Sequence, residues 1–206
     1  MGATIQIGID FDNTLIDYDR VFLAAARERG LIHPGFRGSK RAVRDAIRRS
    51  PDGELTWQRL QGYVYGRGID GAVPFDGVPD FLRRCQARKL AVSIVSHKTR
   101  YGHHDPAQID LREAALEWMT AQGFLGPEAG LPVEHVFFED TRAAKLLRIS
   151  ALSCTHFIDD LEEIFTDPGF PAGVKRILFA SEGSPSCDVV CASWAEIAAA
   201  IFDDGS

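Results

Sequence analysis

The sequence is poor in cysteine, and its cysteines are widely scattered. Their spacing gives neither a disulfide framework nor the Cys-x-x-Cys pairs of a zinc site. Cys187 and Cys191 could form half of a metal site, but two small residues beside a late strand are the simpler interpretation. The four cysteines are Cys85, Cys154, Cys187 and Cys191.

Long apolar runs are also missing. No run approaches the roughly 20 residues that cross a bilayer, and the N-terminal residues lack the basic and apolar regions of a secretory signal. Positive charge is in the minority, with 23 Lys and Arg against 29 Asp and Glu and a formal net charge of −6. Since bulk attraction to nucleic acid or anionic membranes is then not expected, we predict a cytoplasmic protein that binds neither.

What the sequence does contain is a regular alternation of apolar and amphipathic segments. With 206 residues, 45% of them hydrophobic, the chain can bury one main core. The apolar segments lack a polar residue at every second position, as expected for parallel strands covered on both faces. Strands that alternate with helices predict an α/β fold with a doubly wound, Rossmann-like parallel sheet. The expected strands span 4–10, 89–96, 133–138, 155–160, 175–180 and 188–192, and the expected helices span 78–87, 110–122, 141–150, 160–165 and 194–202.

One long segment interrupts this alternation. No strand is expected in 17–75, and an all-helical insertion directly after the first strand predicts a cap over the carboxyl end of that strand. Ligands bind at this end of open α/β sheets. We therefore predict a core domain of 1–16 and 76–206 and a small helical cap domain of 17–75. The expected cap helices span 19–30, 39–49 and 54–66.

Two aspartates stand at the end of the first expected strand. Asp10 and Asp12 follow the apolar run IQIGI and share one side of an extended chain. Carboxylates this close repel each other unless a cation or a shared proton intervenes. Asp12-Asn13-Thr14 alone could be a turn, but a turn does not explain Asp10, since a carboxylate at the end of a buried strand needs a partner. The pair therefore indicates a functional site.

The segment DFDNT at 10–14 resembles the DxDxT signature of the haloacid dehalogenase-like (HAD) superfamily of phosphohydrolases. Three further motifs of that superfamily follow in a fixed order. Ser96 closes the apolar run VSIVS, and Lys145 lies on the helix after the third core strand. Asp159 and Asp160 close the run HFIDD. Each match alone has an ordinary explanation, but all four in order, across nearly the whole chain, make the resemblance specific and imply a HAD-type core.

The resemblance implies the roles of these residues. Asp10 would attack phosphorus and form an aspartyl-phosphate. Asp12 would protonate the leaving oxygen and then accept a proton from the water that hydrolyses the intermediate. Ser96 and Lys145 would stabilise the charge on the phosphoryl oxygens, while Thr14 would brace the loop.

Mg²⁺ is the cofactor that these carboxylates predict, because it takes hard oxygen ligands. The metal would also let several carboxylates stay ionised side by side. Asp10, Asp159 and Asp160 are the expected ligands, and by resemblance Asp12 adds its backbone carbonyl.

Which lysine meets the phosphate stays open. Lys145 and Asp159 are closer in sequence than in many members of the superfamily, so Lys98 is the alternative phosphate-binding lysine. The loop SHKTRYGHHD after the second core strand is long and polar. The residues expected at the substrate are Thr14, Ser96, His97, Lys98 and Arg100.

The expected cap contains a basic helix. Arg41, Arg44 and Arg48 recur at i, i+3 and i+7, on one face. A solvated face is the favoured interpretation, and a positive lid that guides anionic substrates is the alternative.

We therefore predict a Mg²⁺-dependent phosphomonoesterase for a small phosphorylated metabolite, such as a sugar phosphate. Dehalogenases of the superfamily lack the second aspartate, so Asp12 favours phosphate esters over carbon–halogen bonds. The oligomeric state is left open. A phosphotransferase or phosphomutase with the same intermediate is one alternative, and a non-catalytic binding protein with a HAD-like fold is another. A nucleic-acid end phosphatase is disfavoured by the net charge.

Overall fold

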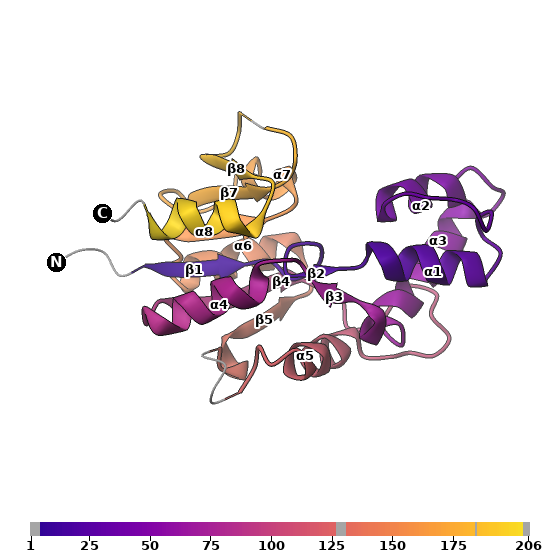
Figure 1. Cartoon of the computed structure of the whole chain (residues 1–206), viewed down its shortest axis with the longest axis horizontal. Coiled ribbons are helices and arrows are strands. Elements are labelled where there is room, and N and C mark those ends of the chain that lie inside the picture. The colour runs from indigo at the N-terminus through magenta and orange to yellow at the C-terminus, as the bar shows by residue number, and fades with distance from the viewer. Residues whose placement is uncertain (1–4, 127–130, 184, 204–206) are drawn as a thin grey trace. The chain divides into compact units, whose positions relative to one another are not determined.

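Figure 1 shows the computed structural model of the chain, which describes residues 5–126, 131–183 and 185–203. These residues form two compact units. The sheet unit contains the described residues of Met1–Ile16, Pro74–Lys98 and Gln122–Ser206. The helical unit contains Asp17–Val73 and Thr99–Ala121. The grouping thus adds Thr99–Ala121 to the segment expected as the cap, and the domain boundaries drawn from the sequence stay a prediction.

A six-stranded parallel sheet forms the centre of the sheet unit, in the order β5-β4-β1-β6-β7-β8. Numbered by their sequence order within this sheet, the strands lie 3-2-1-4-5-6, the order of a doubly wound nucleotide-binding sheet. The predicted α/β fold with a parallel sheet is therefore confirmed. The strands are β1 (Gln6–Ile9), β4 (Ala91–His97), β5 (Val136–Glu139), β6 (His156–Asp159), β7 (Lys175–Phe179) and β8 (Val189–Cys191).

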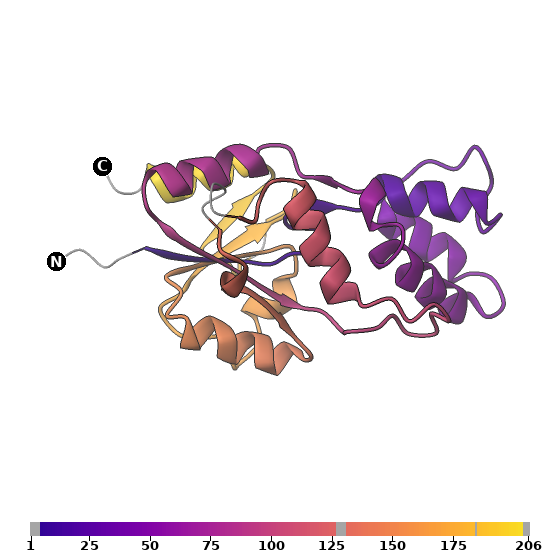
Figure 2. The ribbon, with the colours of Figure 1, turned by 90° about the horizontal axis from the view of Figure 1, so that it is seen from below.

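Helices cover both faces of this sheet. Figure 2 shows α4 and α8 together on one side of the strands and α6 on the other. Two of these helices begin at a polar cap: Thr141 caps the N-terminus of α6, and Ser193 caps that of α8, each by accepting a hydrogen bond from a backbone N–H. The helices of the unit are α4 (Val78–Ala87), α6 (Arg142–Ala151), α7 (Glu162–Phe165) and α8 (Trp194–Phe202).

The helix predictions for 78–87 and 194–202 match the observed bounds. Most observed strands are shorter than expected, and the start of the strand expected at 133–138 is instead a 3₁₀ turn, η2 (Val133–His135). Thr4, in the strand expected at 4–10, lies outside the described residues.

The helical unit is built around aromatic side chains. Phe22 on the first helix stacks on Trp57 of the third, with ring centroids 4.9 Å apart, and Tyr65 meets Tyr18 edge to face at 4.9 Å. All-helical structure was expected here, but two-residue strands, β2 (Ile16–Asp17) and β3 (Val73–Pro74), pair at its margins. The helices are α1 (Asp19–Glu28), α2 (Lys40–Ile47), α3 (Gly53–Tyr65), the 3₁₀ turn η1 (Ile69–Gly71) and α5 (Leu111–Ala121).

Close backbone packing explains why Thr99–Ala121 belongs to the helical unit. A Cβ atom on Gly102 would lie 2.6 Å from the Cα atom of Gly62 on α3, so the loop and the helix approach too closely for a side chain at either contact. On α5, the indole N–H of Trp118 donates a hydrogen bond to the carbonyl of Ala72 at 3.1 Å. Neither contact can be predicted from the local pattern of apolar and polar residues, because each joins residues that are far apart in the sequence.

Across the part of the chain that the structure describes, no helix combines the length and the apolar character needed to span a bilayer.

Candidate active site

Asp10 lies at the carboxyl end of β1, where the order of the sheet changes direction. Its backbone N–H donates to the carbonyl of Ile158 at 2.9 Å, which continues the β1–β6 pairing by one residue. The chain runs from β1 to β4 on one side and reaches β6 on the other, so this edge is the topological switch point at which doubly wound sheets bind ligands. Ile9 and Phe11 are fully buried on either side and fix the direction of Asp10.

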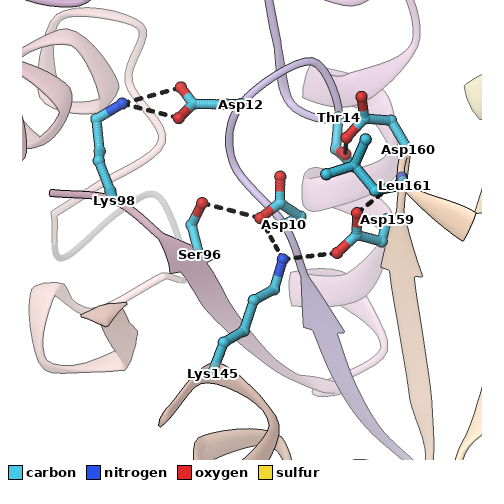
Figure 3. A network of polar contacts seen from close by, with 9 residues as sticks. All are labelled: Asp10, Asp12, Thr14, Ser96, Lys98, Lys145, Asp159, Asp160 and Leu161. Carbon is cyan, nitrogen blue, oxygen red and sulfur yellow. Dashed lines mark hydrogen bonds and ion pairs between the residues drawn. The ribbon is translucent and has the colours of Figure 1, made fainter. Parts of the chain in front are cut away.

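Two donors from other elements hold one carboxylate oxygen of Asp10 (Figure 3). The hydroxyl of Ser96, in β4, donates to Oδ1 at 2.8 Å, and the ammonium of Lys145, on α6, donates to the same atom at 2.6 Å. No hydrogen bond from a described residue reaches Oδ2 of Asp10. The carboxylate is therefore oriented through Oδ1, and the lone pairs of Oδ2 are available to bind a metal ion or to attack a substrate.

Lys145 joins two of the aspartates. Its Nζ also donates to Oδ2 of Asp159 at 2.6 Å, and its side chain is only 2% exposed. Burial disfavours the charged ammonium, but the adjacent carboxylates of Asp10 and Asp159 outweigh burial and raise the pKa of Lys145 above its ordinary value. Lys145 therefore stays charged at any physiological pH.

Asp159 is completely buried at the end of β6. Burial raises the pKa of its carboxyl group to about 6; Asp10 adds to this increase, while Lys145 opposes it. Its Oδ1 atom accepts a hydrogen bond from the backbone N–H of Leu161 at 2.9 Å. The carboxylate is thus held between two donors and faces Asp10 across the ammonium.

Asp10, Asp159 and Asp160 form a group that fits a divalent cation. Each offers one carboxylate oxygen, and these three atoms lie within 4.8 Å of one another. Small side-chain shifts would bring oxygens at this spacing onto one Mg²⁺, whose ligands lie at about 2.0–2.1 Å. If all four aspartates of the predicted site are ionised, its two lysines leave an excess of two negative charges, which one divalent ion balances.

Asp12 makes a different contact. Both of its carboxylate oxygens accept hydrogen bonds from Nζ of Lys98, each at 2.9 Å. The side chain of Asp12 is therefore outside the three-carboxylate group. The ligand expected from Asp12 is its backbone carbonyl, and this role stays a prediction.

A tight loop presents Asp12 and Thr14 beyond the end of β1. The N–H of Leu15 donates to the carbonyl of Phe11 at 3.0 Å, and Asn13 has a left-handed backbone with φ of 59°, which asparagine tolerates well. The indole of Trp194 donates to the carbonyl of Thr14 at 3.0 Å. The hydroxyl of Thr14 donates to Oδ1 of Asp160 at 3.5 Å, and the expected role of Thr14 in bracing the loop stays a prediction.

The other predicted substrate residues make contacts elsewhere. The imidazole of His97 is exposed and lies 3.1 Å from the carbonyl of Asp140. Arg100 belongs to the helical unit, where its guanidinium pairs with Asp110 at 2.7 Å. No described contact joins either side chain to Asp10, and their roles toward substrate stay predictions.

The basic helix of the helical unit carries ion pairs of its own. Arg44 pairs with Asp45 at 2.9 Å, and Arg48 pairs with Glu54 at 2.6 Å. These exposed pairs favour the interpretation of a solvated face over that of a positive lid.

The pairing of Lys98 with Asp12 is the feature that the sequence did not reveal. The two residues are 86 positions apart, and Lys98 was expected at the substrate phosphate. No local signal distinguishes a lysine that binds phosphate from one that binds a carboxylate, because both follow a strand in the same way.

The fold is shared with known hydrolases. A HAD family hydrolase from Deinococcus radiodurans, solved with bound phosphate and sodium, has 17% sequence identity and a TM-score of 0.57, over 100% of this chain and 98% of that one. A haloacid dehalogenase-like family hydrolase from Streptococcus pneumoniae has 14% identity and a TM-score of 0.62, over 97% and 99%. A structure described as a predicted phosphoglycolate phosphatase, from Haemophilus somnus, has 14% identity and a TM-score of 0.56, over 96% and 97%.

Structures described as dehalogenases also match, at 12% identity. No protein-family model and no curated protein matches the sequence. The similarity is thus one of structure along essentially the whole length of these chains, and it confirms the fold that the sequence motifs implied. The chain therefore has the fold of the haloacid dehalogenase-like hydrolases.

Proposed function

We propose that the protein is a Mg²⁺-dependent phosphomonoesterase that works through an aspartyl-phosphate on Asp10. The observation that carries this proposal is the contact set of Asp10. One carboxylate oxygen is held by Ser96 and Lys145, and the other receives no hydrogen bond from the described residues. A carboxylate that is oriented and charge-compensated in this way is suited to attack an electrophilic phosphorus.

In the first step, an oxygen of Asp10 forms a bond to phosphorus while the bond from phosphorus to the ester oxygen breaks. The leaving oxygen takes a proton from Asp12. Ser96 and Lys145 stay beside the reacting carboxylate and stabilise the negative charge of the transferred group. Their burial strengthens this interaction, because the local dielectric is lower than that of water.

In the second step, water attacks the phosphorus of the aspartyl-phosphate. Asp12, now ionised, accepts the proton of that water, and inorganic phosphate leaves with Asp10 regenerated. The same residue thus serves as acid and then as base.

Asp10, Asp159 and Asp160 would hold the metal ion. When bound, Mg²⁺ would supply positive charge to the phosphoryl oxygens of the substrate. In the absence of the ion, these three carboxylates would repel both one another and the dianionic substrate, although Lys145 offsets part of that repulsion.

We propose a small phosphorylated metabolite as the substrate. The excess of negative charge argues against long polyanions such as nucleic acids. Dehalogenation of a carbon–halogen bond is less well supported, because a halide leaves without a proton and would have no use for Asp12. A phosphomutase would differ only in transferring the phosphoryl group to a second hydroxyl group rather than to water.

The test is phosphate release from a panel of phosphorylated metabolites and p-nitrophenyl phosphate with Mg²⁺, for the wild type, Asp10→Asn and the control Asp76→Asn. Asp76 is an exposed carboxylate of the same unit. We expect Asp10→Asn to lose at least about three orders of magnitude in kcat, as for other covalent nucleophiles, and the control to retain activity. Acid-quenched wild type should carry an acyl-phosphate that hydroxylamine removes.

Near wild-type turnover by Asp10→Asn would refute the assignment of the nucleophile. Formation of an isomer from a sugar phosphate, without release of phosphate, would show that the protein is a mutase and not a hydrolase. Halide release from haloacids, without activity on any phosphate ester, would overturn the proposal altogether.

A further inference from the structure

The backbone of Lys98 is fixed to the sheet immediately after β4. Its N–H donates to the carbonyl of Glu139, the last residue of β5, at 3.0 Å. This bond extends the β4–β5 pairing by one residue. Lys98 therefore projects its side chain from a rigid position rather than from a free loop.

The side chain of Lys98 is almost completely enclosed. Its Nζ lies 5.2 Å from the ring centroid of Phe11, which is itself fully buried, and contacts both oxygens of Asp12 at 2.9 Å. The side chain of Lys98 is 2% exposed, whereas that of Asp12 is 20% exposed. The cation thus lies behind the carboxylate, and the carboxylate is the partner that reaches the surface.

This arrangement calls for an explanation beyond stability. Removing two charges from water costs free energy that their mutual attraction does not always repay, so a buried ion pair is weak evidence for a stabilising role. Contact of both oxygens with one buried ammonium, however, restrains rotation of the carboxyl group about its side-chain bonds. Fixed geometry is what a proton donor to a departing oxygen requires.

We infer that Lys98 is a positioning residue: when Asp12 is protonated, the ammonium of Lys98 holds one carboxyl oxygen in place, and the other oxygen, which carries the proton, delivers it to the leaving oxygen. This inference rests on the proposed function of Asp12. It assigns Lys98 a role distinct from direct binding of the phosphate. Loss of Lys98 leaves the carboxylate free to turn away from the leaving oxygen, so proton transfer becomes less frequent at each encounter with substrate.

The consequence depends on the leaving group. A p-nitrophenolate ion is stable in water and leaves without protonation, whereas an alkoxide from glycerol phosphate requires a proton as it departs. A poorly placed Asp12 therefore slows transfer from the alkyl ester more than from the aryl ester. A lysine that binds the phosphate itself would affect both esters alike, because the phosphoryl group is the same.

The experiment measures kcat/KM for p-nitrophenyl phosphate and glycerol phosphate in wild type, Lys98→Met, Lys98→Arg and the control Lys89→Met. Lys89 is an exposed lysine of the same unit. This constant covers the steps up to formation of the aspartyl-phosphate, so it isolates the departure of the leaving group. We expect Lys98→Met to lose about 10-fold or more on glycerol phosphate relative to p-nitrophenyl phosphate, within the range of general acid catalysis. Lys98→Arg should recover part of this loss, and Lys89→Met should show no difference.

A double-mutant cycle with Asp12→Asn supplies the second measurement. If Lys98 acts through Asp12, adding Lys98→Met to Asp12→Asn leaves the ratio of the two kcat/KM values unchanged. Equal losses on both esters, or a full effect of Lys98→Met in the Asp12→Asn background, would overturn the inference. Should Lys98→Met fail to fold, as judged by circular dichroism, Lys98→Gln carries the same comparison.

The outcomes separate this inference from the proposed function. If turnover depends on Asp10 but the Lys98 variants leave the ratio of the two kcat/KM values unchanged, only the role of Lys98 is refuted. If both esters are turned over without Asp10, the proposed function itself is refuted.

Discussion

Gly8, in the central strand β1, should not tolerate even a methyl group. A Cβ atom at this position would lie 2.5 Å from Cδ2 and 2.9 Å from Cε2 of Phe157, and 3.0 Å from Sγ of Cys154. Phe157 is the direct neighbour of Gly8 in the β1–β6 register and is fully buried. Its ring cannot swing into solvent, so the strain of Gly8→Ala must be absorbed by the strands.

The magnitude follows from two opposing effects. Forcing an extra methyl group into a packed core costs about 1–3 kcal/mol. Replacing glycine by alanine also reduces the conformational entropy of the unfolded chain, which returns about 0.4–1 kcal/mol. The midpoints of these ranges predict that Gly8→Ala lowers the free energy of unfolding by about 1.3 kcal/mol, or the melting temperature by roughly 3–5 °C for a chain of this size.

Urea unfolding followed by tryptophan fluorescence and by circular dichroism would measure this change. Gly183→Ala is the matched control, because a Cβ atom there meets nothing within 4 Å, and it should stay within about 0.5 kcal/mol of wild type. Phe157→Leu should relieve part of the strain, so the double variant should be more stable than the two single effects predict. A Gly8→Ala protein as stable as the control would refute the close packing between β1 and β6.

Three further predictions concern the metal, a helix cap and the thiols. Chelation by EDTA should abolish phosphate release and added Mg²⁺ should restore it, because the clustered carboxylates repel the substrate; full activity in protein shown by mass spectrometry to be metal-free would contradict this. Thr141→Ala should lower the free energy of unfolding in urea by about 1 kcal/mol, since the hydroxyl accepts the N–H of Ala144 at the start of α6 at 3.1 Å; an unchanged midpoint would show that the cap adds nothing. A thiol reagent at pH 8 should modify Cys187, which is half-buried, before the buried cysteines. The reason is that burial raises the pKa of Cys85 to about 12 and that of Cys154 to about 11, so these thiols form little thiolate. Rapid labelling of all four cysteines at the same rate would argue against these buried positions.

Much of the sheet unit could be predicted because its signals are local. Strands such as β4 are continuous apolar runs, and helices such as α8 begin at a serine that caps the first turn. The two-residue strands β2 and β3 carry no such signal, since two residues show no periodicity. The packing of Gly102 against Gly62 depends on distant backbone segments, and for this reason the grouping of Thr99–Ala121 with the helical unit was not foreseen.

The residues of the candidate site also differ in how well the sequence predicts them. Asp10, Ser96 and Asp159 could be named in advance, because polar residues that end buried parallel strands must meet at one edge of the sheet. The partner of a long side chain cannot be named in this way. Lysine reaches several ångströms from its backbone, so only the folded structure distinguishes Lys145, which bridges two aspartates, from Lys98, which holds Asp12.

The wide separation of the site residues along the chain has a consequence for biosynthesis. Lys145 is 135 residues from Asp10, and Ser96 is 86 residues from it. A ribosome must therefore synthesise the chain through Asp160 before all of the carboxylates, the serine and the lysine can assemble, although Asp10, Asp12, Ser96 and Lys98 are present once residue 98 is made. Metal affinity would then report the pairing of β6, which ends at Asp159, with β1 during translation, not formation of any single helix or hairpin.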